Sequence, residues 1–88
     1  MLITDIQTMK LNDIFVETNH ILVFRSNIDD KYKATKACVE LEKIEGVHRV
    51  NVDLNDWENI LRLECGLEIS EHRVQQAISH LGFVCEEL

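Results

Sequence analysis

The sequence predicts an α+β fold, a ferredoxin-like βαββαβ sandwich in which two helices cover one face of a four-stranded antiparallel sheet. Apolar strand-like segments and helical segments occur in the order strand, helix, strand, strand, helix, strand. Each helical segment ends at a glycine that an apolar strand follows, Gly46-Val47 and Gly82-Phe83. Right-handed crossovers then place both helices on the same face. Residues 20–88 are the expected domain, and residues 1–19 are an N-terminal extension.

The first expected strand is "HILVFRS", a short apolar run that begins at His20 and is rich in strand formers. Successive side chains of a strand point to opposite faces of the sheet. We therefore expect Leu22 and Phe24 to face the helices, and Ile21 and Val23 to lie on the open face of the sheet.

The first helix is expected to begin at Asp29 or Asp30, where a carboxylate can accept hydrogen bonds from the free amides of the first turn. Gly46 follows the last turn, where a left-handed backbone favours glycine. Apolar residues recur between these points at helical spacing, on one face. They are Ala34, Ala37, Cys38, Leu41 and Ile44.

The central hairpin follows from two alternating segments joined by "NDW". In "VHRVNVDL" the apolar positions are Val50, Val52 and Leu54, and in "ENILRLEC" they are Leu61 and Leu63. This alternation is typical of half-buried strands.

The second helix is expected to begin after Ser70, which can cap its first turn. Gly82 ends it, and "FVCEEL" (residues 83–88) forms the last strand. Its apolar face comprises Val74, Ala77, Ile78 and Leu81.

Composition limits the possible partners. Nine basic and sixteen acidic residues give a net charge of −7, and the basic residues form no cluster. Nucleic acid and anionic membranes are therefore not expected partners, whereas a protein with a basic surface, or a cation, fits the charge. The start of the chain lacks the features of a secretory signal, and no apolar run approaches the ~20 residues that span a bilayer, so we expect a cytoplasmic protein.

The N-terminal extension is unusually apolar. Its side chains are expected to cover Ile21 and Val23 in the same chain or across a homodimer, and the open sheet face is itself a possible dimer contact. The alternative is a frayed terminus. The apolar residues are Leu2, Ile3, Ile6, Met9, Leu11, Ile14, Phe15 and Val16.

Residues 20–88 resemble the heavy-metal-associated domain, the small fold of copper chaperones and of the N-terminal modules of copper-transporting ATPases. The matching segments are "SNI" after the first strand, "KIEGV" after the first helix, "VNVDL" in the second strand and "AISHLGFVCEEL" at the C-terminus. In this family a G-M-x-C-x-x-C motif joins the first strand to the first helix, and its two cysteines hold a soft metal ion.

Counted back from Gly46 with the family's spacing, Asn27 stands at the motif's glycine and Ile28 at its methionine, a core anchor under the loop. Asp30 and Lys33 stand at the two cysteines. Asp30 offers a hard oxygen ligand, and the Lys33 ammonium repels cations, whereas Cu(I) prefers thiolates. The resemblance therefore implies a scaffold whose soft-metal site has been lost.

Asp30 and Lys33 are three residues apart and are expected to pair, either as an ordinary exposed ion pair or with the ammonium in the place of the family's cation. Tyr32 and Trp57 lie near this end, either as anchors of a docking surface or as partly buried rings that close the core. Phe83, after Gly82, matches a position beside the family's metal loop that is aromatic or cationic in the family. The expected docking loop comprises Asn27, Ile28, Asp29, Tyr32, Trp57 and Phe83.

Displaced metal ligands are an alternative. His20, Cys65 and Cys85 are expected toward the end opposite the loop, where they could converge on a copper or zinc ion. Cysteines inside a small core otherwise act as small apolar residues, and three widely spaced cysteines indicate no disulfide framework. A hard cation, or simply a solvated acidic face, is possible at the loop end. The acidic residues there are Asp29, Asp30, Asp56 and Glu58.

Three functions follow, none of them enzymatic, because no catalytic constellation is present. The leading hypothesis is a docking or regulatory module without a cofactor, which binds a protein partner with a basic surface. The second is a copper- or zinc-binding or transport protein that uses displaced ligands. The third is a small-molecule sensor of the ACT type, although "SNIDDK" lacks the glycine that such a ligand loop needs.

Overall fold

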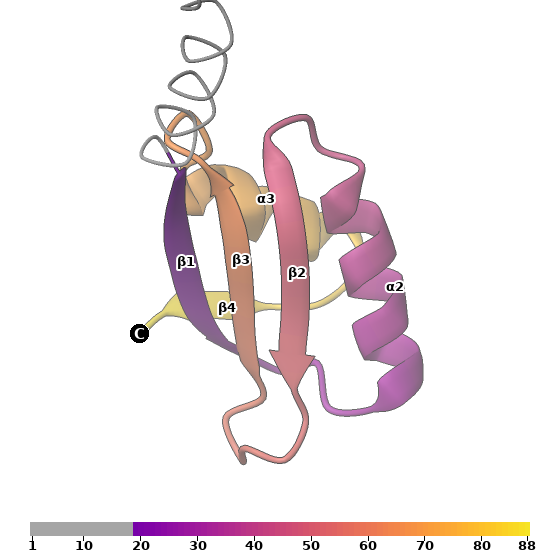
Figure 1. The fold of residues 1–88 in the computed structure, drawn as a ribbon. Coiled ribbons are helices and arrows are strands. Elements are labelled where there is room, and N and C mark those ends of the chain that lie inside the picture. The colour runs from indigo at the N-terminus through magenta and orange to yellow at the C-terminus, as the bar shows by residue number, and fades with distance from the viewer. Residues whose placement is uncertain (1–18) are drawn as a thin grey trace, which may run out of the picture.

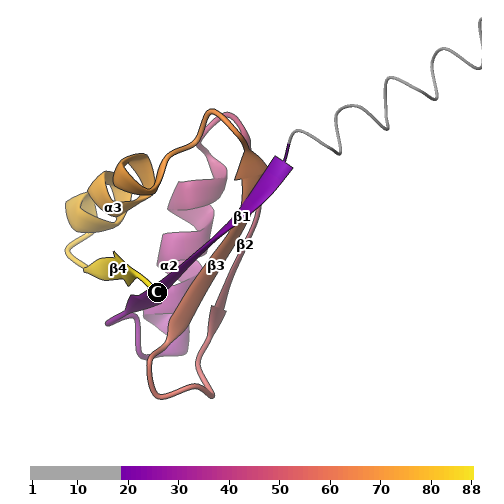
Figure 2. The ribbon, with the colours of Figure 1, turned by 90° about the vertical axis from the view of Figure 1, so that its left-hand side faces the viewer.

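The computed structural model describes residues 19–88, which form one sheet and two helices (Figure 1). The strand order is β2-β3-β1-β4 with every neighbouring pair antiparallel, and both helices lie on one side of the sheet (Figure 2). The predicted ferredoxin-like sandwich is confirmed. The predicted cover of the sheet by the N-terminal extension involves residues 1–18, which lie outside the described residues. In chain order the elements are β1 (Asn19–Ser26), α2 (Lys31–Glu42), β2 (Val47–Asp53), β3 (Ile60–Gly66), α3 (Glu71–His80) and β4 (Cys85–Glu87).

The predicted capping residues and glycines lie at the ends of the two helices. Asp30 caps α2, because its carboxylate accepts a hydrogen bond from the backbone N–H of Lys33 at 2.8 Å, and Ser70 caps α3 in the same way. Gly46 and Gly82 follow the two helices with φ angles of +99° and +90°. These angles lie in the region that side chains disfavour, which explains a glycine at each position.

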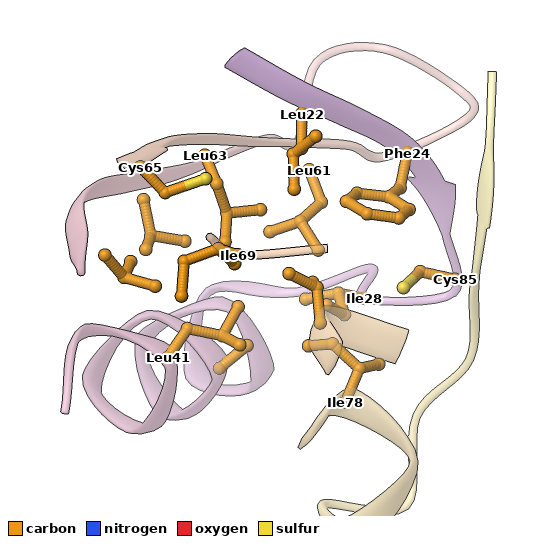
Figure 3. Packing of buried hydrophobic residues seen from close by; sticks show 14 residues of the cluster. Leu22, Phe24, Ile28, Leu41, Leu61, Leu63, Cys65, Ile69, Ile78 and Cys85 are labelled. Atoms are coloured by element: carbon orange, nitrogen blue, oxygen red, sulfur yellow. The ribbon is translucent and has the colours of Figure 1, made fainter. Parts of the chain in front are cut away.

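The core lies between the sheet and the two helices (Figure 3). Leu22 and Phe24 point into it as expected, whereas Ile21, on the opposite face, is 51% exposed. Burying each large apolar side chain stabilises the fold by roughly 1.5–3 kcal/mol. The fully buried residues of the core are Phe24, Ile28, Ala37, Leu41, Leu61, Leu63, Cys65, Val74 and Ile78.

Two strand ends differ from the prediction. Leu54 lies beyond the end of β2 and is 38% exposed, so it does not continue the inward alternation. β4 has three residues instead of the predicted six. The backbone N–H of Phe83 instead donates to Ile78 O at 3.1 Å, and that of Val84 donates to Asn27 Oδ1 at 2.9 Å. The N–H groups of both residues are therefore not used in a strand ladder, although Val84 O still accepts the Asn27 backbone N–H. No helix within residues 19–88 is long and apolar enough to cross a membrane.

Candidate functional site

Three connecting segments meet at one end of the sheet, which we call the loop end. They are the β1–α2 loop (residues 27–30), the β2–β3 turn (residues 54–59) and the turn before β4 (residues 82–84). Figure 1 shows the first two side by side below the sheet.

Hydrogen bonds from Ser26 and Asn27 join the three segments. Ser26 donates its backbone N–H to Glu58 O at 3.0 Å and its hydroxyl to Asn59 O at 2.7 Å. Asn27 donates its N–H to Val84 O at 3.2 Å, and its side-chain oxygen accepts the Val84 N–H. Sequence reasoning missed the role of Ser26. A Ser-Asn pair at a strand end is a recognisable signal, because both side chains readily bond nearby backbone groups.

Ile28 anchors the loop from below. Its side chain is fully buried in the core, and its backbone N–H donates to the Ser26 hydroxyl at 3.2 Å. The loop is therefore held both by packing and by hydrogen bonds.

Lys33 pairs with Asp29 rather than with Asp30. Its Nζ lies 2.8 Å from Asp29 Oδ1, whereas Asp30 Oδ1 accepts the Lys33 backbone N–H. The predicted ion pair between Asp30 and Lys33 is wrong, because the extended backbone of Asp30 (φ −144°) turns its carboxylate toward the helix amides. The hydrogen bond and the attraction of the two charges lower the pKa of Asp29 and raise the pKa of Lys33.

The two aromatic residues at this end are solvent-exposed. Trp57 is 87% exposed and Tyr32 is 76% exposed, so neither ring closes the core and that alternative is wrong. Phe83, in contrast, packs partly against the core.

Beside Trp57 lies a groove of roughly 400 Å³. At its side Arg25 Nε approaches Glu58 Oε2 at 3.6 Å. The groove therefore offers an exposed indole and an apolar wall next to charged groups. Its lining includes Arg25, Asn27, Trp57, Glu58, Val84 and Cys85.

The displaced ligands do not converge. His20 lies directly opposite Cys65 in the β1–β3 pair, and its Nε2 is 3.1 Å from Ile69 O. Cys85, however, lies opposite Ser26, at the loop end. Figure 3 shows Cys65 and Cys85 at opposite ends of the core. The prediction that His20, Cys65 and Cys85 meet away from the loop is wrong, because β4 runs antiparallel to β1 and its first residue, Cys85, lies opposite the last residue of β1.

The thiols are also poorly prepared for a soft metal, which binds the thiolate. Cys38, Cys65 and Cys85 are all free, and burial raises the pKa of each thiol, that of Cys85 to about 11. At the loop end, Asp56 Oδ1 accepts the Glu58 N–H at 2.8 Å. Within residues 19–88, no three His, Cys, Asp or Glu side chains are arranged to hold a metal ion.

No protein-family model matches the sequence, and no curated protein sequence is significantly similar to it. Solved structures do share the fold. Oxidized MerP from Ralstonia metallidurans CH34 has 13% identity and a TM-score of 0.69, over 78% of this chain and 96% of that one. The N-terminal domain of a potential copper-translocating P-type ATPase from Bacillus subtilis, in the Cu(I)-loaded state, has 20% identity and a TM-score of 0.68, over 78% of this chain and 86% of that one.

The yeast copper transporter domain CCC2A, described in apo and Cu(I)-loaded states, has 17% identity and a TM-score of 0.68. This match covers 77% of this chain and 93% of that one. At identities this low, the likeness establishes a common fold.

Proposed function

Because the chain has the fold of the heavy-metal-associated domains, we propose that it is a non-enzymatic protein-docking module that holds no soft metal and binds its partner through the loop end. The observation that carries this proposal is the Lys33 ammonium, held 2.8 Å from Asp29 at the junction of β1 and α2. By the family's spacing, this is where a cysteine pair would hold Cu(I).

The chemistry of the junction supports the loss of soft-metal binding. Asp30 offers oxygen to the helix amides, and Lys33 brings a positive charge where a cation would have to sit. The nearest thiol along the chain, Cys38, lies two turns into α2 and is partly buried. A thiolate pair for near-linear Cu(I) coordination is therefore missing from the described residues.

The exposed surface of the loop end supports docking. Trp57, Tyr32 and Val84 expose large apolar areas on a framework fixed by hydrogen bonds. Aromatic side chains are enriched at protein interfaces, and a surface that is already ordered loses little entropy on binding.

The partner is a protein with a basic surface, and no cofactor is involved. The chain carries a net charge of −7 and steers positively charged partners toward it. Its three free thiols fit the reducing cytoplasm.

The metal half of the proposal is tested by restoring the cysteine pair. We expect Asp30→Cys with Lys33→Cys to bind about one Cu(I) per chain, because the start of α2 favours thiolates. The measurement is competition with a colorimetric Cu(I) chelator under reducing conditions, and each single variant is a control. The proposal fails if the parent chain competes as well as the double variant, since Cys38, Cys65 or Cys85 would then be a ligand.

The docking half is tested with Trp57→Ala as bait in affinity capture of basic proteins. The matched control is Leu67→Ala, which removes a 60% exposed apolar side chain from the turn after β3, at the far end of that strand. We expect Trp57→Ala to lose the captured partner and Leu67→Ala to keep it, with both variants folded by circular dichroism. Equal capture by the two variants would exclude the loop end as the docking surface.

A further inference from the structure

β2 forms one edge of the sheet, and part of that edge is already in contact with α2. β2 is the first strand in the order β2-β3-β1-β4, and among residues 19–88 no strand pairs with its outer side. α2 runs alongside this edge (Figure 1). Between them lies a groove of roughly 350 Å³, which we call the edge groove. Its apolar lining is Ala34, Cys38, Val39, Val50, Val52 and Leu54.

The backbone groups of Val50 and Val52 point into the edge groove. The Cys38 thiol lies 3.7 Å from Val50 O and donates to it, so this carbonyl points away from β3. Hydrogen-bond direction alternates along an antiparallel strand, which gives Val52 the same outward direction. The hydrogen bonds between β1 and β4 show which residues of β1 point toward β3. Counting from these residues through the β1–β3 and β2–β3 registers also makes Val50 and Val52 point away from β3. The edge therefore offers backbone donors and acceptors for another strand, and Val50 O would exchange its long bond from the Cys38 thiol for one from that strand.

We propose that a second copy of this chain occupies the edge, with its β2 antiparallel to the first and a two-fold axis at Asn51. In this register Val50 lies opposite Val52 of the second copy, so two outward-pointing residues form a hydrogen-bonded pair. Arg49 lies opposite Asp53 of the second copy, and the symmetry repeats this ion pair. Both side chains are exposed.

The charges select this register over its neighbours. A shift of two residues in either direction keeps the outward-pointing residues paired, but it places Arg49 opposite Asn51 or Asn55 instead of Asp53. Opposite charges directly across a strand pair stabilise it, and like charges destabilise it. The sequence of β2 is thus complementary to itself in one antiparallel register.

The helix layer is complementary about the same axis. Cys38 lies level with Val50, and Asn51 is one residue, about 3.3 Å, further along β2. Because α2 runs in the opposite direction and rises about 1.5 Å per residue, the axis passes α2 near its residue 36. Rotation about it brings Lys31 close to Glu42 of the second copy.

Lys31 lines the edge groove, and Glu42 is near enough to the Cys38 thiol to raise its pKa. The ion pairs of α2 that lie within residues 19–88 involve Lys33 and Lys43, so Lys31 and Glu42 are open to an intermolecular partner. α2 therefore carries a positive charge near one end of the edge groove and a negative charge near its own C-terminal end, which fits a two-fold-related copy better than it fits a uniformly basic partner. The contact also covers Val39, which is 49% exposed.

The first test exchanges the charges of β2 in the full chain. Arg49→Asp leaves two acidic residues on the edge, and Asp53→Arg leaves two basic residues. We expect the parent to show a concentration-dependent monomer–dimer equilibrium by analytical ultracentrifugation, and each variant alone to associate at least about tenfold more weakly. An equimolar mixture of the two variants should regain the dimer, because the acidic edge of one variant then lies opposite the basic edge of the other.

A parent chain that stays monomeric at all concentrations overturns the proposal. Variants that dimerise like the parent, or a mixture that does not regain the dimer, also overturn it, since the dimer would then use another surface. Asp53 Oδ1 accepts the Asn55 N–H at 3.0 Å, so Asp53→Asn, which keeps an oxygen there, controls for a local change in the turn.

The second test determines which residues of the two β2 strands lie opposite each other. Residue 51 is the only position of β2 that lies opposite itself in the second copy, in a non-hydrogen-bonded pair with Cα atoms about 4.5 Å apart. We expect Asn51→Cys to form a disulfide-linked dimer on mild oxidation, because this distance suits a disulfide. Arg49→Cys, on the same face, is about 13 Å from itself in the second copy and should remain monomeric.

The parent, oxidised in parallel, accounts for the three native thiols. Equal cross-linking at positions 49 and 51, or none at position 51, overturns the register.

Discussion

Cys85 shows how position alone changes a side chain's chemistry. It begins β4 at the loop end, is 7% exposed, and lies beside Phe24 and Ile28 in Figure 3. Removal from water disfavours its charged form, which raises the pKa of the thiol from 9.0 to about 11. The residue is therefore an apolar core component at any physiological pH.

This burial predicts a loss of stability in alkali. Between pH 9 and pH 11 the unfolded chain releases a proton from Cys85 that the folded chain retains. The contribution is fully present below pH 9 and is lost as pH rises, by at most about 1.4 kcal/mol per pH unit. Urea unfolding across this range should show a shallower decline for Cys85→Ala than for the parent. Equal slopes would mean that the thiol gains access to water in the folded state.

Local chemistry at the loop end was predictable from the sequence, and spatial partners were not. The hydrogen bond from the Lys33 amide to the Asp30 carboxylate joins residues only three positions apart, so the residue types predict it. The ion pair was assigned to the wrong carboxylate, because once Asp30 turns inward the ammonium reaches Asp29. Cys85 was placed at the wrong end, although the antiparallel pairing of β4 with β1 puts the start of β4 at the loop end.

At the scale of elements, the two helix-ending glycines lie in different surroundings. A side chain at Gly82 would meet no atom within 4 Å, whereas one at Gly46 would lie 3.2 Å from Ile69 Cδ1 and would crowd the Glu68 carboxylate. Both positions have positive φ.

Substitution should separate backbone strain from crowding. Gly82→Ala is expected to lower the free energy of unfolding by about 1–2 kcal/mol, from left-handed backbone strain alone. Gly46→Ala should cost more, because Ile69 must also move. Chemical denaturation measures both. If the two substitutions cost the same, the surroundings of Gly46 yield freely and the crowding argument fails.

The helices were predictable as whole elements because caps, apolar spacing and terminal glycines coincide in each. The last strand was not, since the Val84 N–H donates to the Asn27 side chain instead of to a backbone carbonyl. That bond joins residues 57 positions apart, and nothing local to "FVCEEL" signals it.

At the scale of the whole molecule, the open sheet face carries Ile21, which is 51% exposed, and the partly buried Val23. Removing the apolar-rich residues 1–18 is expected to lower the melting midpoint and to cause aggregation, as removal of a cover would. Covering each large apolar side chain contributes roughly 1.5–3 kcal/mol to the free energy of unfolding.

Light scattering and thermal unfolding measure both effects. Ile21→Thr in the shortened chain is the control, because it removes the apolar side chain and keeps a strand-forming residue, and it should restore monodispersity. A shortened chain that is already monodisperse with an unchanged midpoint would contradict the prediction.

The ammonium of Lys33, tied to Asp29 at the head of α2, also determines what the domain responds to. A pair of thiols at this position would change with oxidant and with the supply of an ion, so the surface around it would report on both. A carboxylate and an ammonium keep their charges across the physiological pH range and have no oxidation chemistry. If the loop end docks a partner as proposed, its charges therefore do not change with oxidant or with the supply of a metal ion. The timing of recognition is then set by how much of the protein is made and by when its partner is present.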